Sequence, residues 1–345
     1  MKPFILTVDY ELFFGVDSGT VENCMIRPTK KLARLLGEYG GKMTLFWDIL
    51  HYVRLGQLAS QVPGLMLDKE LIENQIRQLV IEGHDVQMLL HPHWLDAQWD
   101  GYRWRFDYRR FALQNLSTAS DENDINTILG CVTIGRKTIE ELIVPLDSSY
   151  RVTTVRIGGH MIEPFGLLRE AFLQNNIILD SSVIRKVNNH NSMFPYAFEN
   201  VPDELFYRFD LSVLEPIDSG VFWEFPMETI RIPRLKRMWL AQIKHLGYIN
   251  PGRYGDGKGL GERRPFRETS LWERIVRKRL KFTPENSFPE KWHYLTAQAQ
   301  PYSVARVHSK NLNPLTLNML EDSFHAGDFR FISIKDRFEQ LVNKT

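Results

Sequence analysis

Two histidines separated by one residue, His91 and His93, stand at the end of an apolar run and could bind a metal ion together. In an extended strand, residues i and i+2 point to the same side, so both imidazoles would face one cation. Pro92 marks where this run must leave a sheet. For the pair alone, solvated loop histidines are the better interpretation. A second chemical cluster, Asp9 and Glu11, follows another apolar run and favours the metal site.

Short β-rich runs alternate with segments of helical periodicity along the chain. The predicted strands lie at 4–9, 42–48, 84–90, 152–156, 177–180, 222–226, 304–308 and 329–334, and the predicted helices include 30–39, 71–80 and 163–174. This alternation is typical of parallel strands joined by crossover helices. The sequence therefore predicts an α/β fold with seven or eight mainly parallel strands.

Most of the predicted strands end in, or just before, a polar side chain that can do chemistry. These residues are Asp9, Asp48, His91, Arg156, Asp180, Glu224 and His308. In a barrel of parallel strands such ends converge on one face, where active sites lie. Each residue taken singly is equally well explained as the point where a strand reaches water. The set as a whole favours an enzyme.

Composition limits the class of protein. The chain has 345 residues and a formal net charge of +1, which argues against a general polyanion binder, so no nucleic-acid partner is expected. Only Cys24 and Cys131 are present, which favours a reducing compartment over a disulfide framework. The first residues run directly into a predicted strand, and no apolar run approaches the roughly 20 residues of a membrane-spanning helix. These features predict a cytoplasmic protein.

Five segments resemble the motifs of the polysaccharide deacetylase family, which includes chitin, peptidoglycan and nodulation-type chitooligosaccharide deacetylases. The matching segments are Thr7-Val8-Asp9-Tyr10-Glu11, Gly83-His84-Asp85-Val86 with His91-Pro92-His93-Trp94, Val155-Arg156-Ile157-Gly158-Gly159, Leu179-Asp180-Ser181-Ser182-Val183, and Arg306-Val307-His308-Ser309-Lys310. The resemblance covers most of residues 4–226 and again 304–341. It implies the distorted (β/α) barrel of that family, as a single domain over residues 1–345.

The resemblance also implies roles for individual residues. Asp9 would be the general base, and His308 would protonate the departing amine. Arg156 would hold Asp9 ionised and oriented through a charge-assisted pair. The implied metal ligands are Glu11, His91 and His93. A divalent ion, Zn²⁺ with Co²⁺ or Ni²⁺ as alternatives, would activate water and polarise the acetamide carbonyl.

One residue departs from the family pattern. The usual ligand histidines are spaced four residues apart, which maps onto positions 89 and 93, and residue 89 is leucine. Either His91 supplies the missing imidazole from the same side of the strand, or the metal site is weakened or lost. We favour the first interpretation because residues 89, 91 and 93 would share a face.

Three carboxyl groups have two open interpretations each. Asp180 would hydrogen-bond His308 or Arg156, or cap the following turn. Asp48 would reach the site or cap the helix that begins at Ile49. Glu224 would bind a sugar hydroxyl or form a structural ion pair.

An aromatic-rich loop follows the histidines and is the predicted sugar platform. It includes Trp94, Trp99 and Trp104, and sugar C–H faces stack on such rings. The alternative, which is compatible with this role, is a β-hairpin over 98–106 that turns at Asp100-Gly101.

Basic charge is concentrated in one region. Residues 228–281 hold 15 Lys or Arg against 5 Asp or Glu, and we interpret 228–300 as a basic insertion within the barrel domain. Residues 270–282 have the pattern of a basic amphipathic helix, which would contact an anionic membrane surface at the inner face of the membrane or an anionic substrate. A solvated face is the slightly favoured alternative.

These observations predict a metal-dependent hydrolase that removes an acetyl group from an N-acetylated sugar. The expected substrate is a polysaccharide or a glycan precursor, including a lipid-linked sugar. The alternative is a catalytically inactive relative that keeps the barrel and binds a glycan or a partner. Leu89 favours this alternative, whereas the joint presence of Asp9, Arg156 and His308 favours the enzyme.

Overall fold

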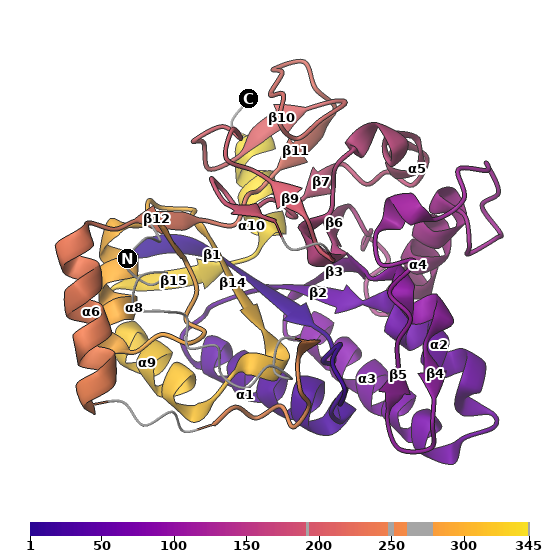
Figure 1. The fold of residues 1–345 in the computed structure, drawn as a ribbon, viewed down its shortest axis with the longest axis horizontal. Coiled ribbons are helices and arrows are strands. Elements are labelled where there is room, and N and C mark those ends of the chain that lie inside the picture. Colours follow the sequence, from indigo (N-terminus) through magenta and orange to yellow (C-terminus); the bar gives the residue numbers. More distant parts are fainter. Residues whose placement is uncertain (191–192, 248–251, 261–278, 344–345) are drawn as a thin grey trace. The chain divides into compact units, whose positions relative to one another are not determined.

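The computed structural model describes residues 1–190, 193–247, 252–260 and 279–343. The chain forms two compact units (Figure 1). The first comprises Met1–Val8, Leu12–Met43 and Glu228–Thr345, and the second comprises Asp9–Glu11 and Thr44–Met227. Strand β1 (Lys2–Tyr10) begins in the first unit and ends in the second, so it delivers Asp9 and Glu11 to the second.

The second unit is built on a sheet whose strands are mainly parallel. Its strand order is β10 (Tyr207–Phe209), β11 (Phe222–Glu224), β7 (Leu179–Asp180), β6 (Thr154–Ile157), β3 (Asp85–Leu90) and β2 (Thr44–Asp48). Every neighbouring pair in this order is parallel except β10 with β11. All residues of β2, β3 and β6 are buried, as expected of parallel strands covered on both faces.

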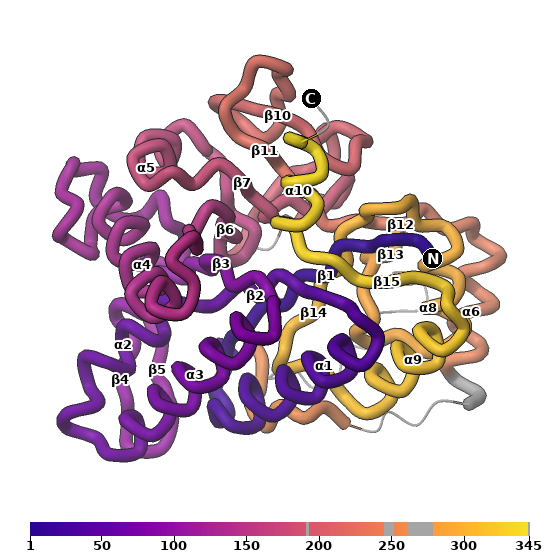
Figure 2. Tube along the Cα trace, turned by 180° about the vertical axis from the view of Figure 1, so that it is seen from behind, coloured from indigo at the N-terminus to yellow at the C-terminus, as the bar shows by residue number. Residues whose placement is uncertain are grey.

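Helices cover this sheet. They are α2 (Ile49–Ala59), α3 (Pro63–Ile81), α4 (Ile128–Ile143) and α5 (Arg169–Gln174). Three of them, α2, α3 and α4, contact β3 and one another, as Figure 2 shows from behind. Gly135 of α4 lets this helix approach the sheet, because a Cβ there would lie 3.0 Å from Met88 Sδ and 3.1 Å from Ile49 Cγ2.

The first unit has its own strands and helices. Strands β14 (Val304–His308) and β15 (Phe329–Ile332) both pair with β1, and β12 (Thr229–Arg231) pairs with β13 (Arg279–Lys281). Its helices are α1 (Arg27–Glu38), α6 (Arg234–Gly247), α8 (Pro289–Gln298), α9 (Pro314–His325) and α10 (Ile334–Val342). Phe4 lies at the centre of an aromatic core, with ring centroids 5.0 Å from Phe282 and 5.4 Å from Phe329.

Short elements complete the described chain. They are η1 (Glu22–Ile26), η2 (Pro92–Asp96), β4 (Gln98–Trp99), β5 (Trp104–Arg105), η3 (Leu113–Asn115), η4 (Gly158–His160), η5 (Phe165–Leu167), β8 (Asn188–Asn189), β9 (Tyr196–Ala197) and η7 (Ser309–Asn311). In the described part of the chain, no helix is both long and apolar enough to cross a membrane.

The predicted fold class, a distorted (β/α) barrel with mainly parallel strands, is confirmed, and all eight predicted strands are present. Two helix predictions are wrong in part. The helix predicted over 163–174 is an α-helix only from Arg169, after the short helix η5. The Glu163 side chain accepts hydrogen bonds from the backbone of Phe165 and Val213, which hold its own segment outside the α-helix. Residues 270–278 of the predicted basic helix lie outside the described residues, and its end, Arg279–Lys281, is strand β13.

Candidate functional site

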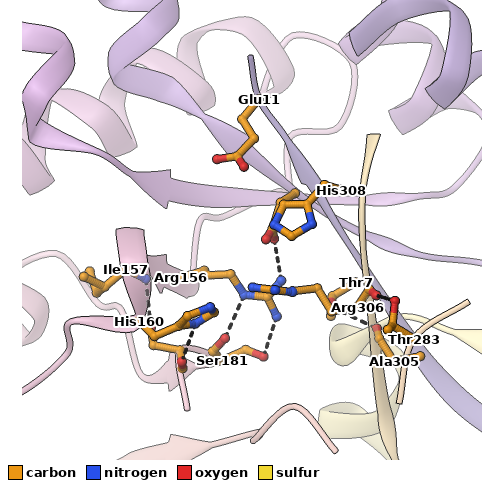
Figure 3. Close-up of polar contacts among 12 residues, drawn as sticks. Thr7, Glu11, Arg156, Ile157, His160, Ser181, Thr283, Ala305, Arg306 and His308 are labelled. Carbon is orange, nitrogen blue, oxygen red and sulfur yellow. Dashed lines mark hydrogen bonds and ion pairs between the residues drawn. The ribbon is translucent and has the colours of Figure 1, made fainter. Parts of the chain in front are cut away.

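A buried ion pair joins β1 to β6 within the second unit. Arg156 Nη1 donates to Asp9 Oδ1 at 2.5 Å, and the two side chains are 1% and 5% exposed. The rest of the guanidinium is equally constrained, since Nε donates to the Ser181 carbonyl at 2.7 Å and Nη2 to Ser181 Oγ at 2.9 Å (Figure 3). Its charge also lies over the Phe46 ring, 4.2 Å from the centroid. The Asp9–Arg156 pair predicted from sequence is therefore present.

A second buried group contains two carboxylates and one imidazole. Ligand atoms of Glu11, Asp48 and His91 all lie within 4.8 Å of one another. His91 Nδ1 is 3.3 Å from Asp48 Oδ2 and 3.6 Å from Glu11 Oε2. Burial raises the pKa of Asp48, and the charge of Glu11 adds to the rise, whereas His91 and the Trp94 indole oppose it. A buried carboxylate of this kind is stabilised either by keeping a proton or by binding a cation.

Sheet register explains why Asp48 belongs to this group. Asp48 is the Cα partner of Leu89, and Leu89 is the Cα partner of Arg156, so the three residues form one row across β2, β3 and β6. Residues in one row of a parallel sheet project from the same face. Asp48 therefore supplies a donor beside the leucine that interrupts the expected histidine pattern.

Asp48 is the N-cap residue of α2, but its side chain makes no capping hydrogen bond. Oδ2 instead accepts from Trp94 Nε1 at 2.7 Å. Of the two interpretations of Asp48, the structure favours the one in which it reaches the site.

His93 is not a member of this group. Strand β3 ends at Leu90 and Pro92 begins the short helix η2, so His91 and His93 do not alternate as neighbours in a strand would. The His93 ring is fully buried and stacks on Phe111, with centroids 4.8 Å apart and planes at 12°. The imidazole that remains in the group, His91, packs on Gly158, where a Cβ would lie 2.2 Å from His91 Cδ2.

The aromatic loop forms the expected hairpin, with β4 paired to β5 and Gly101 at φ 95° in its turn. Trp94 and Trp104 have 0% and 2% of their surface exposed, so neither has a ring face open to a sugar. This placement corrects the expectation that both contribute to a platform. Trp99 keeps part of its surface open, and Tyr102 at the turn is 81% exposed.

Asp180 and Glu224 lie side by side at the ends of β7 and β11. They are Cα partners in the parallel register, and their exposed fractions are 2% and 0%. Asp180 accepts hydrogen bonds from the backbone N–H and the hydroxyl of Ser182, at 2.8 and 2.7 Å, as a turn-capping aspartate does. Glu224 is fully buried, and its proposed contact with a sugar hydroxyl stays a prediction.

His308 lies at the end of β14 in the first unit, where it contacts Glu285. His308 Nδ1 lies 2.9 Å from Glu285 Oε1 and 3.2 Å from Oε2, and the His308 backbone N–H also donates to this carboxylate. Burial opposes ionisation of Glu285, but His308 and Arg306 overcome this effect and hold the pKa of Glu285 below its ordinary value. Glu285 was not predicted, because a single glutamate in a basic segment has no diagnostic spacing.

Comparisons with known proteins give no match to any protein-family model and none to a curated protein. Three solved structures have similar folds at low identity. A protein of Mycobacterium smegmatis, provisionally named a polysaccharide deacetylase, is 14% identical with a TM-score of 0.45, over 99% of this chain and 90% of that one. A family 4 carbohydrate esterase of Streptomyces lividans, solved with acetate, is 11% identical with a TM-score of 0.38, over 96% and 93%.

The third structure is a 4-α-glucanotransferase of Thermococcus litoralis, 12% identical with a TM-score of 0.45, over 98% of this chain and 40% of that one. All three TM-scores lie below 0.5, so the function of this chain is inferred from its own residues.

Proposed function

We propose that this chain is a metal-dependent hydrolase that removes an acetyl group from an N-acetylated sugar. One observation carries the proposal. Asp9 lies in strand β1 and Glu11 directly follows this strand, while Asp48 and Arg156 lie in one row across β2, β3 and β6. These two links join the group of Glu11, Asp48 and His91 to the Asp9–Arg156 ion pair. The motif resemblance described above supports the choice of deacetylation among hydrolytic reactions.

The donor set fits a divalent cation. Asp48 Oδ1 is buried and has no hydrogen-bond partner among the described residues, so it is open to a ligand bond. Oxygen and imidazole donors in this combination suit zinc and other first-row divalent ions. We propose Glu11, Asp48 and His91 as the ligands, with Asp48 in the place expected for His93. A metal bound there would lower the pKa of a water molecule and polarise an amide carbonyl.

The protein's own residues supply the proton transfer. Asp9 is held by Arg156 in one orientation, and its charge is stabilised in a site that excludes bulk water. A carboxylate fixed in this way is suited to accept a proton from an attacking water, which is general-base catalysis. The role of His308 as the acid that protonates the amine stays a prediction, with Glu285 as the residue that orients its ring.

Metal content tests the ligand assignment. Purified protein, loaded with Zn²⁺, Co²⁺ or Mn²⁺ and then desalted, should retain about one ion per chain. Asp48→Asn should retain markedly less, since loss of a ligand weakens a site strongly. Asp85→Asn is the matched control, because Asp85 is also buried but accepts from Thr44 and Gln87 outside the group. Equal metal content in both variants would contradict the assignment.

Acetate release tests the activity. Metal-loaded protein should release acetate from oligomers of N-acetylglucosamine, and Asp9→Asn should abolish release while metal content is retained. Protein that binds such oligomers and a metal without releasing acetate would instead support the non-catalytic alternative that Leu89 favours.

A further inference from the structure

Helix α6 buries one apolar face and exposes another. On its buried face, Leu240 packs with Ile232 and Phe288 in a small core of the first unit. On its exposed face, three apolar residues are spaced three and four positions apart, so they lie side by side along the helix. They are Leu235, Met238 and Trp239, with 80%, 43% and 42% of their surface exposed, and we call them the α6 strip. Large apolar side chains grouped on one exposed face are typical of an interaction surface.

Positive charge accompanies the α6 strip. Residues 229–247 include five Lys or Arg and no Asp or Glu. Arg234, which directly precedes the strip, and Lys244 are both exposed. The Lys236 ammonium lies 3.6 Å from the centroid of the Trp239 ring, so a cation stands directly beside the apolar side chains. An exposed apolar face bordered by Lys and Arg is the pattern of a helix that lies in the interface of an anionic membrane.

The same charge disfavours two other ways of covering the α6 strip. In a symmetric contact between two copies of this chain, each strip would meet its equivalent, and Arg234 and Lys236 of both copies would be brought together. Residues 261–278, which lie outside the described residues, contain six Lys or Arg against three Asp or Glu, so their net charge has the same sign as that of α6. An anionic lipid surface complements both the apolar strip and the cations beside it.

We propose that α6 docks this protein on an anionic membrane surface. The side chains of the α6 strip would insert at the level of the lipid headgroups, and the neighbouring Lys and Arg side chains would contact the lipid phosphates. In Figures 1 and 2, α6 lies at the margin of the first unit, on the outer side of α8, where a flat surface has access to it. The proposal depends on α6 alone and is independent of the proposed hydrolase activity.

Vesicle flotation tests the contribution of the α6 strip. Wild type should float with vesicles of equal parts phosphatidylglycerol and phosphatidylcholine, and not with phosphatidylcholine alone. The double variant Leu235→Gln/Trp239→Gln should bind the anionic vesicles at least tenfold more weakly, because it loses most of the apolar area that inserts. Leu211→Gln/Ile217→Gln is the matched control, because these residues of the second unit are 63% and 49% exposed and should not contribute.

A second pair of variants tests the contribution of charge. Arg234→Gln/Lys244→Gln should weaken binding to the anionic vesicles about thirtyfold, at about fivefold for each cation near the surface. Arg330→Gln/Lys335→Gln removes two exposed cations elsewhere in the first unit and should bind as wild type does. Added NaCl should weaken wild-type binding, because salt screens the attraction between the cations and the lipid phosphates.

Each alternative has its own result. The proposal is wrong if wild type does not float with anionic vesicles, or if Leu235→Gln/Trp239→Gln floats as well as wild type. A dimer in size-exclusion chromatography that this double variant dissociates would show that a second copy covers the α6 strip. A clearly lower Tm of the double variant without vesicles would show that the protein's own chain covers the strip. Either of these two results would also overturn the proposal, and neither bears on metal retention or acetate release.

Discussion

Removal of the Arg156 guanidinium should show how strongly the buried ion pair is coupled. In Arg156→Gln, the Asp9 carboxylate would remain 95% buried without its counter-ion, and the two hydrogen bonds to Ser181 would also be lost. Breaking a buried pair on one side costs about 3–5 kcal/mol. Asp9→Asn should cost a similar amount, because it leaves the buried guanidinium charge uncompensated.

The double variant Asp9→Asn/Arg156→Gln removes both charges together. It should be less destabilised than the sum of the single variants, with a coupling energy of about 3 kcal/mol. Urea unfolding of the four proteins, followed by circular dichroism at pH 7, measures this coupling. Arg156→Lys serves as the conservative variant if Arg156→Gln does not fold. A coupling energy below about 0.5 kcal/mol, the level of an exposed pair, would refute the inference that burial makes this pair strong.

Two further outcomes are expected from single substitutions. Gly158→Ala should displace the His91 ring, because the added Cβ would lie 2.2 Å from His91 Cδ2. Metal retention after desalting should therefore fall. Unchanged retention would show that the position of the ring does not depend on this contact. His51 is fully buried, burial lowers its pKa to about 3, and neither ring nitrogen has a hydrogen-bond partner among the described residues. Below about pH 6.5 the unfolded chain therefore binds a proton at His51 that the folded chain does not bind. The free energy of unfolding should decrease by about 2 kcal/mol as the pH is lowered from 7 to 5. His51→Leu should lack this loss in urea titrations at the two pH values, and parallel losses in both proteins would contradict the assignment of a neutral buried histidine.

The strands were predictable because their apolar runs are short, bounded by turns and separated by helical periodicity. The pairing of Asp9 with Arg156 was also predictable, since each residue lies at the end of a short apolar run. Buried charges of opposite sign are expected to pair with each other. The role of Asp48 was not, because an aspartate before a helix is equally typical of a cap. The register of β2, β3 and β6 and the missing capping hydrogen bond together distinguish the two interpretations.

His93 illustrates the opposite case. Its spacing from His91 predicts a shared face only while the chain stays extended, and the helix η2 begins at Pro92 instead. A one-residue difference in where β3 ends therefore decides which side chain joins the group. Strand ends are the least certain part of any pattern read from sequence. Glu285 and the Asp180–Glu224 pair depend on contacts between distant segments, which no local pattern encodes.

In the row of Asp48, Leu89 and Arg156, an aspartate stands beside the leucine that replaces an expected ligand histidine, and this affects which ion the proposed site prefers. Replacing one nitrogen donor by an oxygen makes the coordination sphere harder and more negative. In the Irving–Williams order, Mn²⁺ and Fe²⁺ bind a given site more weakly than Zn²⁺ does. A site with more oxygen donors reduces this difference in affinity. Reconstitution should therefore begin with Mn²⁺ and Fe²⁺ beside Zn²⁺, because a test with zinc alone could miss the ion that the proposed site binds best.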